Sequence, residues 1–195
     1  MDHQKLVKKG IYLEYATLTW NIAGVILLGW IAPAVHSVAL IAFGFDTLLE
    51  IGASMVVIWE LTGVPGSRQK RALIYLSISF LILGLYLLVQ SGYNLYHRVL
   101  PAQSDLGMAW LTLTFIVMLF LAWKKHRAGK KINNKVLLTE GRVTLVDATL
   151  ALIVLISLLL TGWKGWWWSD PIAGLTLMLY CFWECRHTWA ASSLL

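Results

Sequence analysis

Charged residues are scarce in this sequence: Asp and Glu together number 10 among 195 residues, and charged residues make up only 13%. Apolar residues make up 58%, compared with roughly 45–50% in an ordinary soluble domain, and the mean hydropathy is +0.69. This composition excludes a soluble core. The apolar runs also lack the alternation of apolar and polar residues that marks barrel strands. The sequence therefore predicts membrane-spanning helices.

Motifs of enzymatic chemistry are also missing. The sequence contains no nucleophile and base in a triad pattern, no phosphate-binding loop and no GxGxxG, so we expect neither an enzyme nor an organic cofactor. Two cysteines do not make a disulfide framework. Cys181, Cys185 and His187 cluster in the last apolar run, where thiols can capture a soft metal. In a reducing cytoplasm such thiols are more often small buried hydrophobes.

Six apolar runs are long enough to cross about 30 Å of hydrocarbon. We expect an all-α integral membrane bundle, a single transmembrane domain over residues 1–195 without a C-terminal soluble domain. The first run is full length and lacks an Ala-x-Ala cleavage site, so it should remain as a helix. The expected spans cover approximately residues 12–31, 38–61, 73–93, 106–123, 138–162 and 171–189.

Lysine and arginine gather on one side of these spans. They precede the first run, follow the second, and fill residues 124–135, which we expect to be the longest inner loop. The opposite side has only Arg98 and Lys164. Basic residues favour the cytoplasmic side, so both termini should be cytoplasmic in the inner (plasma) membrane. The net charge of +6 is then a topology signal, and we expect no nucleic-acid partner.

An acidic pair interrupts the second run. Asp46 and Glu50 are four residues apart, so they share one helical face about 6 Å apart along its axis. Ionisable residues at mid-membrane cost roughly 2.5–3.5 kcal/mol each and mark ion or proton pathways. Two such charges repel unless a cation or protons lie between them. A divalent cation whose departure leaves protons behind is the basis of metal/proton exchange; alternatively, one or both acids stay protonated and hydrogen-bond within the bundle.

The fifth run carries a second acidic pair, Glu140 and Asp147, seven residues apart on one face. Asp147 should lie deep enough to meet Asp46 and Glu50. Glu140 should lie near the cytoplasmic mouth, where it attracts cations or pairs with Arg142 or another basic residue.

Three further polar residues have structural as well as functional interpretations. Asn21 in the first run either lines the pathway or makes a bond between helices. Glu14 is close to the inner interface and is expected to be solvated. Asp170, just before Pro171, is typical of a helix cap.

The stretch from Ser37 to Glu50, with Phe43-Gly44-Phe45-Asp46, resembles the second helix of the cation diffusion facilitator, or cation efflux, family. The stretch from Glu140 to Trp189 resembles that family's fifth and sixth helices. The likeness is greatest to short bacterial members that consist of the membrane domain alone. It implies six helices with cytoplasmic ends and export of a divalent metal, often zinc, in exchange for protons, commonly by a homodimer. The family's histidine-rich loop and cytoplasmic metal-binding domain are absent, so a dimer would form through the helices.

The resemblance also implies a ligand set. The family's second-helix pair falls on Asp46 and Glu50, and the last acid of its fifth-helix pair falls on Asp147, whereas the remaining position falls on Val143. Zinc accepts three protein ligands plus water. An all-oxygen site also suits manganese or magnesium, and iron is a further alternative to zinc. Thr144 or Thr47 could replace the missing ligand.

Three hypotheses follow. The first, which we favour, is a secondary transporter that exports a divalent cation, zinc before manganese or iron, through the lipid bilayer in exchange for protons. The second is a membrane interaction protein that retains the fold with a degenerate metal site. The third is a small polar-solute or proton channel in which the acids act as relays.

Overall fold

The computed structural model describes residues 3–34, 38–64, 68–99 and 104–193, apart from the side chains of residues 3, 32–34, 38–42, 45, 161, 170 and 173. Every regular element in these ranges is an α-helix, and each expected span lies within one of them. The helices are α1 (His3–Ala34), α2 (Val38–Leu61), α3 (Gln69–His97), α4 (Asp105–Ile132), α5 (Lys135–Lys164) and α6 (Ser169–Ser193).

The helices extend beyond the apolar runs. The expectation of a long inner loop over residues 124–135 was wrong, because α4 continues to Ile132 and only Asn133 and Asn134 separate it from α5. Lysine, arginine and alanine favour helix, so polarity does not end α4. It ends where Asn133 takes a left-handed conformation, with φ of 51°, and its N–H bonds to the carbonyls of Gly129 and Lys130.

Within the described residues, four helices are long and apolar enough to cross a membrane by length and composition. They are α1, over Gln4–Ile31, and the whole of α3, α4 and α5. Large apolar side chains such as Trp30, Val89 and Ile26 are exposed on the outer surface of the bundle, where lipid would cover them. The bundle is therefore a membrane fold, while six spans remain a prediction for α2 and α6.

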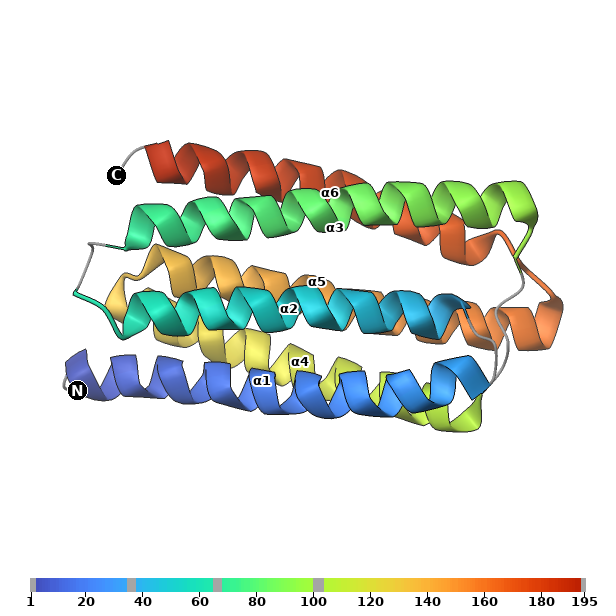
Figure 1. The fold of residues 1–195 in the computed structure, drawn as a ribbon, viewed down its shortest axis with the longest axis horizontal. Coiled ribbons are helices and arrows are strands. Elements are labelled where there is room, and N and C mark those ends of the chain that lie inside the picture. Colours follow the sequence, from blue (N-terminus) through green and yellow to red (C-terminus); the bar gives the residue numbers. More distant parts are fainter. Residues whose placement is uncertain (1–2, 35–37, 65–67, 100–103, 194–195) are drawn as a thin grey trace.

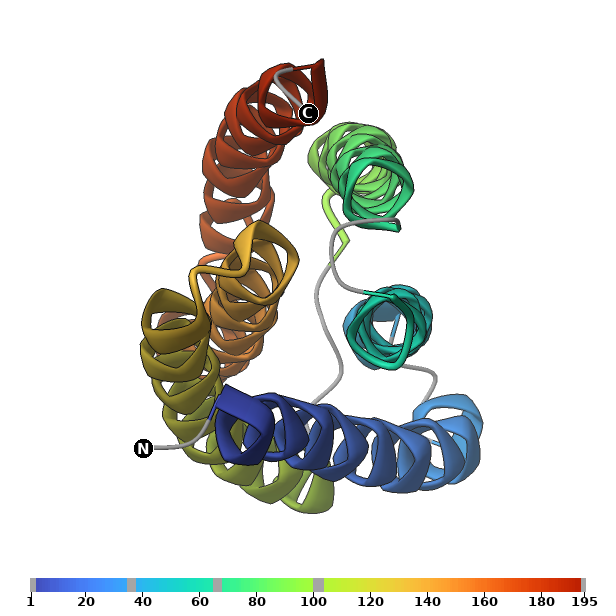
Figure 2. The same ribbon diagram turned by 90° about the vertical axis from the view of Figure 1, so that its left-hand side faces the viewer.

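The helices run alongside one another, and both chain termini lie at the same end of the bundle (Figure 1). Seen from that end, α3 and α6 lie together on one side, and α1, α2, α4 and α5 make up the rest (Figure 2). The most extensive contacts join α3 to α6 and α4 to α5, and α1 packs on α2 and α4.

Glycines allow close contacts within both of these helix pairs. A Cβ added to Gly141 of α5 would lie 3.2 Å from the backbone nitrogen of His126 in α4, and one added to Gly84 of α3 would lie 2.8 Å from the Phe182 ring in α6. Small residues let membrane helices approach in this way. The C-terminal half of α4 is thereby brought against the polar face of α5.

Candidate functional site

Two antiparallel helices, α2 and α5, face each other with polar side chains at successive turns. We call the following set the polar ladder: Asp46, Glu50 and Ser54 on α2, and Asp147, Thr144 and Glu140 on α5.

The members of the polar ladder meet in pairs. Ser54 Oγ donates to Glu140 Oε1 at 3.2 Å, the Thr144 hydroxyl lies beside the Glu50 carboxylate, and the carboxylates of Asp46 and Asp147 lie beside each other. All of these side chains are buried. A continuous line of polar groups therefore runs through the middle of the bundle.

Three carboxylates of the ladder, Asp46, Glu50 and Asp147, form a group that we call the acid trio. Their residues are 4%, 2% and 3% exposed, and Asp147 lies within interaction distance of both other acids. All three line one cavity of about 10 Å³. That volume holds about one water-sized occupant.

Most oxygens of the acid trio have no hydrogen-bond partner. In the part of the chain that the structure describes, Asp46 Oδ2 and both carboxylate oxygens of Glu50 and of Asp147 are buried and unpaired. Orphaned buried acceptors are costly, so this cavity favours an occupant that supplies positive charge or protons. As the side chains stand, no three Asp, Glu, His or Cys residues of the described part are placed to hold a metal ion. A bound cation would therefore draw the carboxylates into new orientations.

The small cavity of the acid trio is also lined by residues that are not acidic. Val143 lines it and offers no ligand atom. Ser79 of α3 lines it too, and its hydroxyl donates to the carbonyl of Tyr75 at 3.1 Å. Sequence reasoning missed Ser79, since nothing distinguishes it from other serines in apolar runs. Of the two proposed substitutes, Thr144 lies beside Glu50, whereas the Thr47 hydroxyl donates to the Phe43 carbonyl at 2.9 Å.

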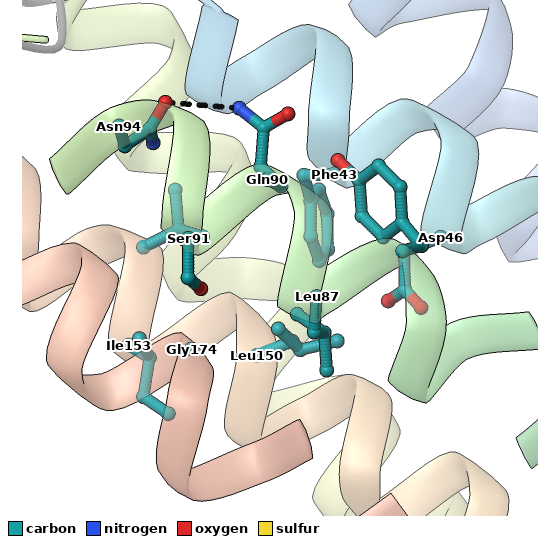
Figure 3. A pocket seen from close by; sticks show the side chains of 11 residues that line it. Phe43, Asp46, Leu87, Gln90, Ser91, Asn94, Leu150, Ile153 and Gly174 are labelled. Carbon is teal, nitrogen blue, oxygen red and sulfur yellow. Dashed lines mark hydrogen bonds between the residues drawn. The ribbon is translucent and has the colours of Figure 1, made fainter. Parts of the chain in front are cut away.

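A larger cavity of about 50 Å³ lies on the other side of Asp46. Figure 3 shows Asp46 at one edge of it, with Gln90 and Asn94 of α3 further along its wall. Gln90 Nε2 donates to Asn94 Oδ1 at 3.2 Å. Both residues lie in the last turns of α3, which ends away from the chain termini (Figure 1). Asp46 thus borders both the small cavity of the acid trio and a larger, mainly apolar cavity toward that end.

A buried lysine joins the polar ladder from α4. Lys125 Nζ lies 2.9 Å from Glu14 Oε2 of α1 and 3.1 Å from Glu140 Oε1 of α5, and it donates to Thr144 Oγ1 at 2.9 Å. The side chains of Lys125 and both glutamates have no exposed surface. We call Glu14, Ser54, Lys125, Glu140 and Thr144 the lysine cluster.

Comparison with known proteins places the chain in a family. Residues 70–193 match the family described as the cation efflux transmembrane domain. The chain belongs to the cation efflux family. This confirms the resemblance to that family, and the matched segment is a transmembrane domain of a family whose members are transporters rather than enzymes.

Two curated proteins are similar to this cation efflux chain. Transmembrane protein 163 of Xenopus laevis is 22% identical over 160 residues, which cover 80% of this chain and 57% of that protein. A protein of Synechocystis described as an uncharacterized transporter is 22% identical over 162 residues, which cover 77% of this chain and 52% of that protein. The chain spans a little over half the length of each relative.

One expectation about this cation efflux protein was wrong and another was right only in part. Glu14 is not solvated but buried against Lys125. Glu140 does pair with a basic residue, but with the buried Lys125 and not with Arg142 at the surface. Arg142 instead forms an ion pair with Glu184 of α6. The sequence did contain a signal for the burial of Lys125. The buried residues of α4 recur at alternating spacings of three and four, and Lys125 belongs to that series. They are Leu111, Thr114, Met118, Leu121, Lys125 and Ala128.

The structure does not decide between the two interpretations of Asn21, and it places Cys185 in a contact between helices. Asn21 is buried, and its Nδ2 has no partner among the described residues. The Ser77 hydroxyl of α3 donates to the Cys185 carbonyl at 2.9 Å, and His187 stacks on Trp183. Cys185 therefore contributes to helix packing. The side chain of Asp170 lies outside the described residues, although α6 does begin at Ser169.

At the end of the bundle that holds the termini, Glu60 of α2 meets Asn134 at the start of α5. The two Glu60 oxygens lie 3.3 and 3.1 Å from Asn134 Nδ2, while Asn134 Oδ1 accepts from the backbone N–H of Leu137 at 2.8 Å and caps the helix. Both line an open hollow of about 550 Å³. Sequence reasoning missed this pair because it lies where a loop was expected.

Proposed function

We propose that this protein exports a divalent cation, with zinc as the first candidate, from the cytoplasm in exchange for protons at the acid trio. The observation that carries the proposal is the five unpaired carboxylate oxygens of Asp46, Glu50 and Asp147 around a cavity of about 10 Å³. Family membership adds cation transport to this geometry.

The exchange follows from the chemistry of buried carboxylates. Three ionised acids at one buried point repel each other, and either a cation or protons relieve the repulsion. Because metal ligands must be deprotonated, cation and protons compete for the same oxygens. Release of the cation on one side and of protons on the other then couples the two movements.

The identity of the cation rests on the donor atoms. Zinc accepts three protein ligands with water in the remaining position, which suits a trio next to Val143. An all-oxygen set also accepts manganese or iron. We retain the implied homodimer and the plasma membrane as parts of the proposal, since both come from the family resemblance.

A membrane interaction protein with a degenerate site is the second candidate. It is favoured by Val143, which lines the small cavity without a ligand atom, and by the lack of any three-ligand arrangement among the described residues. The two candidates differ in whether the cavity takes up a cation.

Purified protein in liposomes distinguishes them. We expect a gradient of Zn²⁺ to drive proton movement, reported by a trapped pH dye, and Asp147→Asn to reduce that movement to the level of empty liposomes because it removes a trio charge. Asp105→Asn, which changes an exposed acid in the first turn of α4, should behave like the wild type. Absence of proton movement with zinc, manganese and iron alike would refute transport and favour the second candidate.

A further inference from the structure

The ammonium group of Lys125 has an oxygen atom close by for each of its N–H donors. It has three N–H donors, and three oxygens surround it: Glu14 Oε2 at 2.9 Å, Glu140 Oε1 at 3.1 Å and Thr144 Oγ1 at 2.9 Å. These acceptors come from α1 and α5. Because these partner side chains are buried together with the ammonium group, Lys125 is held in one position beside the polar ladder.

Thr144 is one of three described threonines whose hydroxyl oxygen accepts from a side-chain N–H, together with Thr114 and Thr139. A helical threonine commonly donates its proton to the carbonyl four residues earlier. Here the Thr144 oxygen accepts from Lys125 instead, and its own proton is directed away from the ammonium. Seven others make the common bond: Thr17, Thr19, Thr47, Thr62, Thr112, Thr149 and Thr176.

The group beside the Thr144 hydroxyl is the Glu50 carboxylate, whose two oxygens are unpaired among the described residues. Glu50 in turn lies beside Asp147. The contacts therefore form a chain from Lys125 through Thr144 to the acid trio.

We propose that Lys125 is a positioning residue for the acid trio, acting through the Thr144 hydroxyl to orient the Glu50 carboxylate toward the cation. This inference rests on the proposed function of the trio. Lys125 occupies the Thr144 oxygen and leaves the threonine proton facing Glu50; when a cation draws the carboxylates into place, a hydrogen bond from Thr144 holds one Glu50 oxygen while the other faces the cavity. The two carboxylates beside Lys125, those of Glu14 and Glu140, offset its charge in full, so Lys125 acts on the trio through the orientation of Thr144 rather than through its charge.

Binding of Zn²⁺ to the purified full chain, measured by equilibrium dialysis, tests this chain of contacts. Thr144→Val keeps the size of the side chain and the lysine charge but removes the hydroxyl. We expect it to weaken Zn²⁺ binding at least about tenfold, as for loss of a hydrogen bond to a charged group. Thr144→Ser should restore binding. Thr149→Val, which removes an ordinary bond to the Leu145 carbonyl on the same helix, should leave binding unchanged.

The lysine is tested by combining variants. If it acts through Thr144, Lys125→Met weakens Zn²⁺ binding by a similar factor and adds little in the Thr144→Val background, because coupled residues are not additive. Additive losses, or a folded Thr144→Val protein that binds as the wild type does, would overturn the proposal. Should Lys125→Met fail to fold, the valine and serine variants of Thr144 decide alone. Equal binding by the wild type and Asp147→Asn would instead refute the proposed function of the trio.

Discussion

Val143 brings a branched apolar side chain to the wall of the cavity between three carboxylates. It lies one turn before Asp147 on α5, so its Cβ already points into the cavity that the acids share. A side chain with a ligand atom at this position would reach the same point in space. The missing fourth ligand is therefore a property of one side chain rather than of the backbone.

Replacing Val143 with histidine should add a nitrogen ligand to the site. Nitrogen favours zinc over manganese, so we expect Val143→His to tighten Zn²⁺ binding roughly tenfold or more, as one added ligand bond would, and to change Mn²⁺ binding much less. Competition between the two metals in equilibrium dialysis measures both effects.

The matched control is Val143→Leu, which adds volume without a ligand atom. Overpacking of the cavity costs about 1–3 kcal/mol of stability and should affect both variants. If leucine also improves Zn²⁺ binding, or histidine improves Mn²⁺ binding equally, the cavity around Val143 is not the zinc site.

Some residues of the site were predictable because their relations are local. The spacing of Asp46 and Glu50 within one helix fixes their common face, and so does that of Glu140 and Asp147. Lys125 was missed for the opposite reason. Its partners lie on α1 and α5, and the spacing that places it on the buried face of α4 leads into a basic stretch that resembles a cytoplasmic loop.

At the scale of the helices, α4 and α5 are in unusually close contact at Gly141. A leucine there would meet the backbone nitrogen of His126 and the carbonyl of Ala122, neither of which can move without shifting α4. Any such shift also withdraws Lys125 from Glu140 and Thr144.

We expect Gly141→Leu to lower the midpoint of thermal unfolding in detergent by several degrees, since overpacking costs roughly 1–3 kcal/mol, and to weaken Zn²⁺ binding as well. Gly92→Leu is the control, because a Cβ at Gly92 of α3 meets nothing within 4 Å. Both variants replace a helical glycine. An equal change in the midpoint for the two would show that backbone flexibility, and not the α4–α5 contact, sets the effect.

The positions of the helices were predictable and their ends were not. Hydropathy marks the part of a helix that suits lipid, and it located the apolar part of all six helices. The backbone, however, continues as helix wherever propensity and capping allow. This is why α1 begins at His3 and α4 reaches Ile132, well beyond the apolar residues.

At the scale of the whole molecule, both termini lie at one end of the bundle (Figure 1). The concentration of lysine and arginine at that end predicts that it is cytoplasmic. We therefore expect a cysteine introduced at Gln4 to react with a membrane-impermeant thiol reagent only after cells are permeabilised. A cysteine introduced at Arg98, which is exposed at the end of α3, should react in intact cells.

The labelling needs a background in which the native Cys181 and Cys185 are replaced, because Cys185 is only partly buried. The reverse pattern, with Gln4→Cys labelled in intact cells and Arg98→Cys protected, would invert the topology. It would also reverse the direction of cation movement in the proposed function.

The lysine cluster has a consequence for biosynthesis. Glu14 is synthesised long before Lys125 and Glu140, so α1 enters the membrane carrying an acid whose counter-ion does not yet exist. A lone ionisable residue makes a helix roughly 2.5–3.5 kcal/mol less favourable in lipid. We therefore expect α1, although long and apolar enough to span a membrane, to become more stable in lipid once Lys125 arrives with α4 and pairs with Glu14.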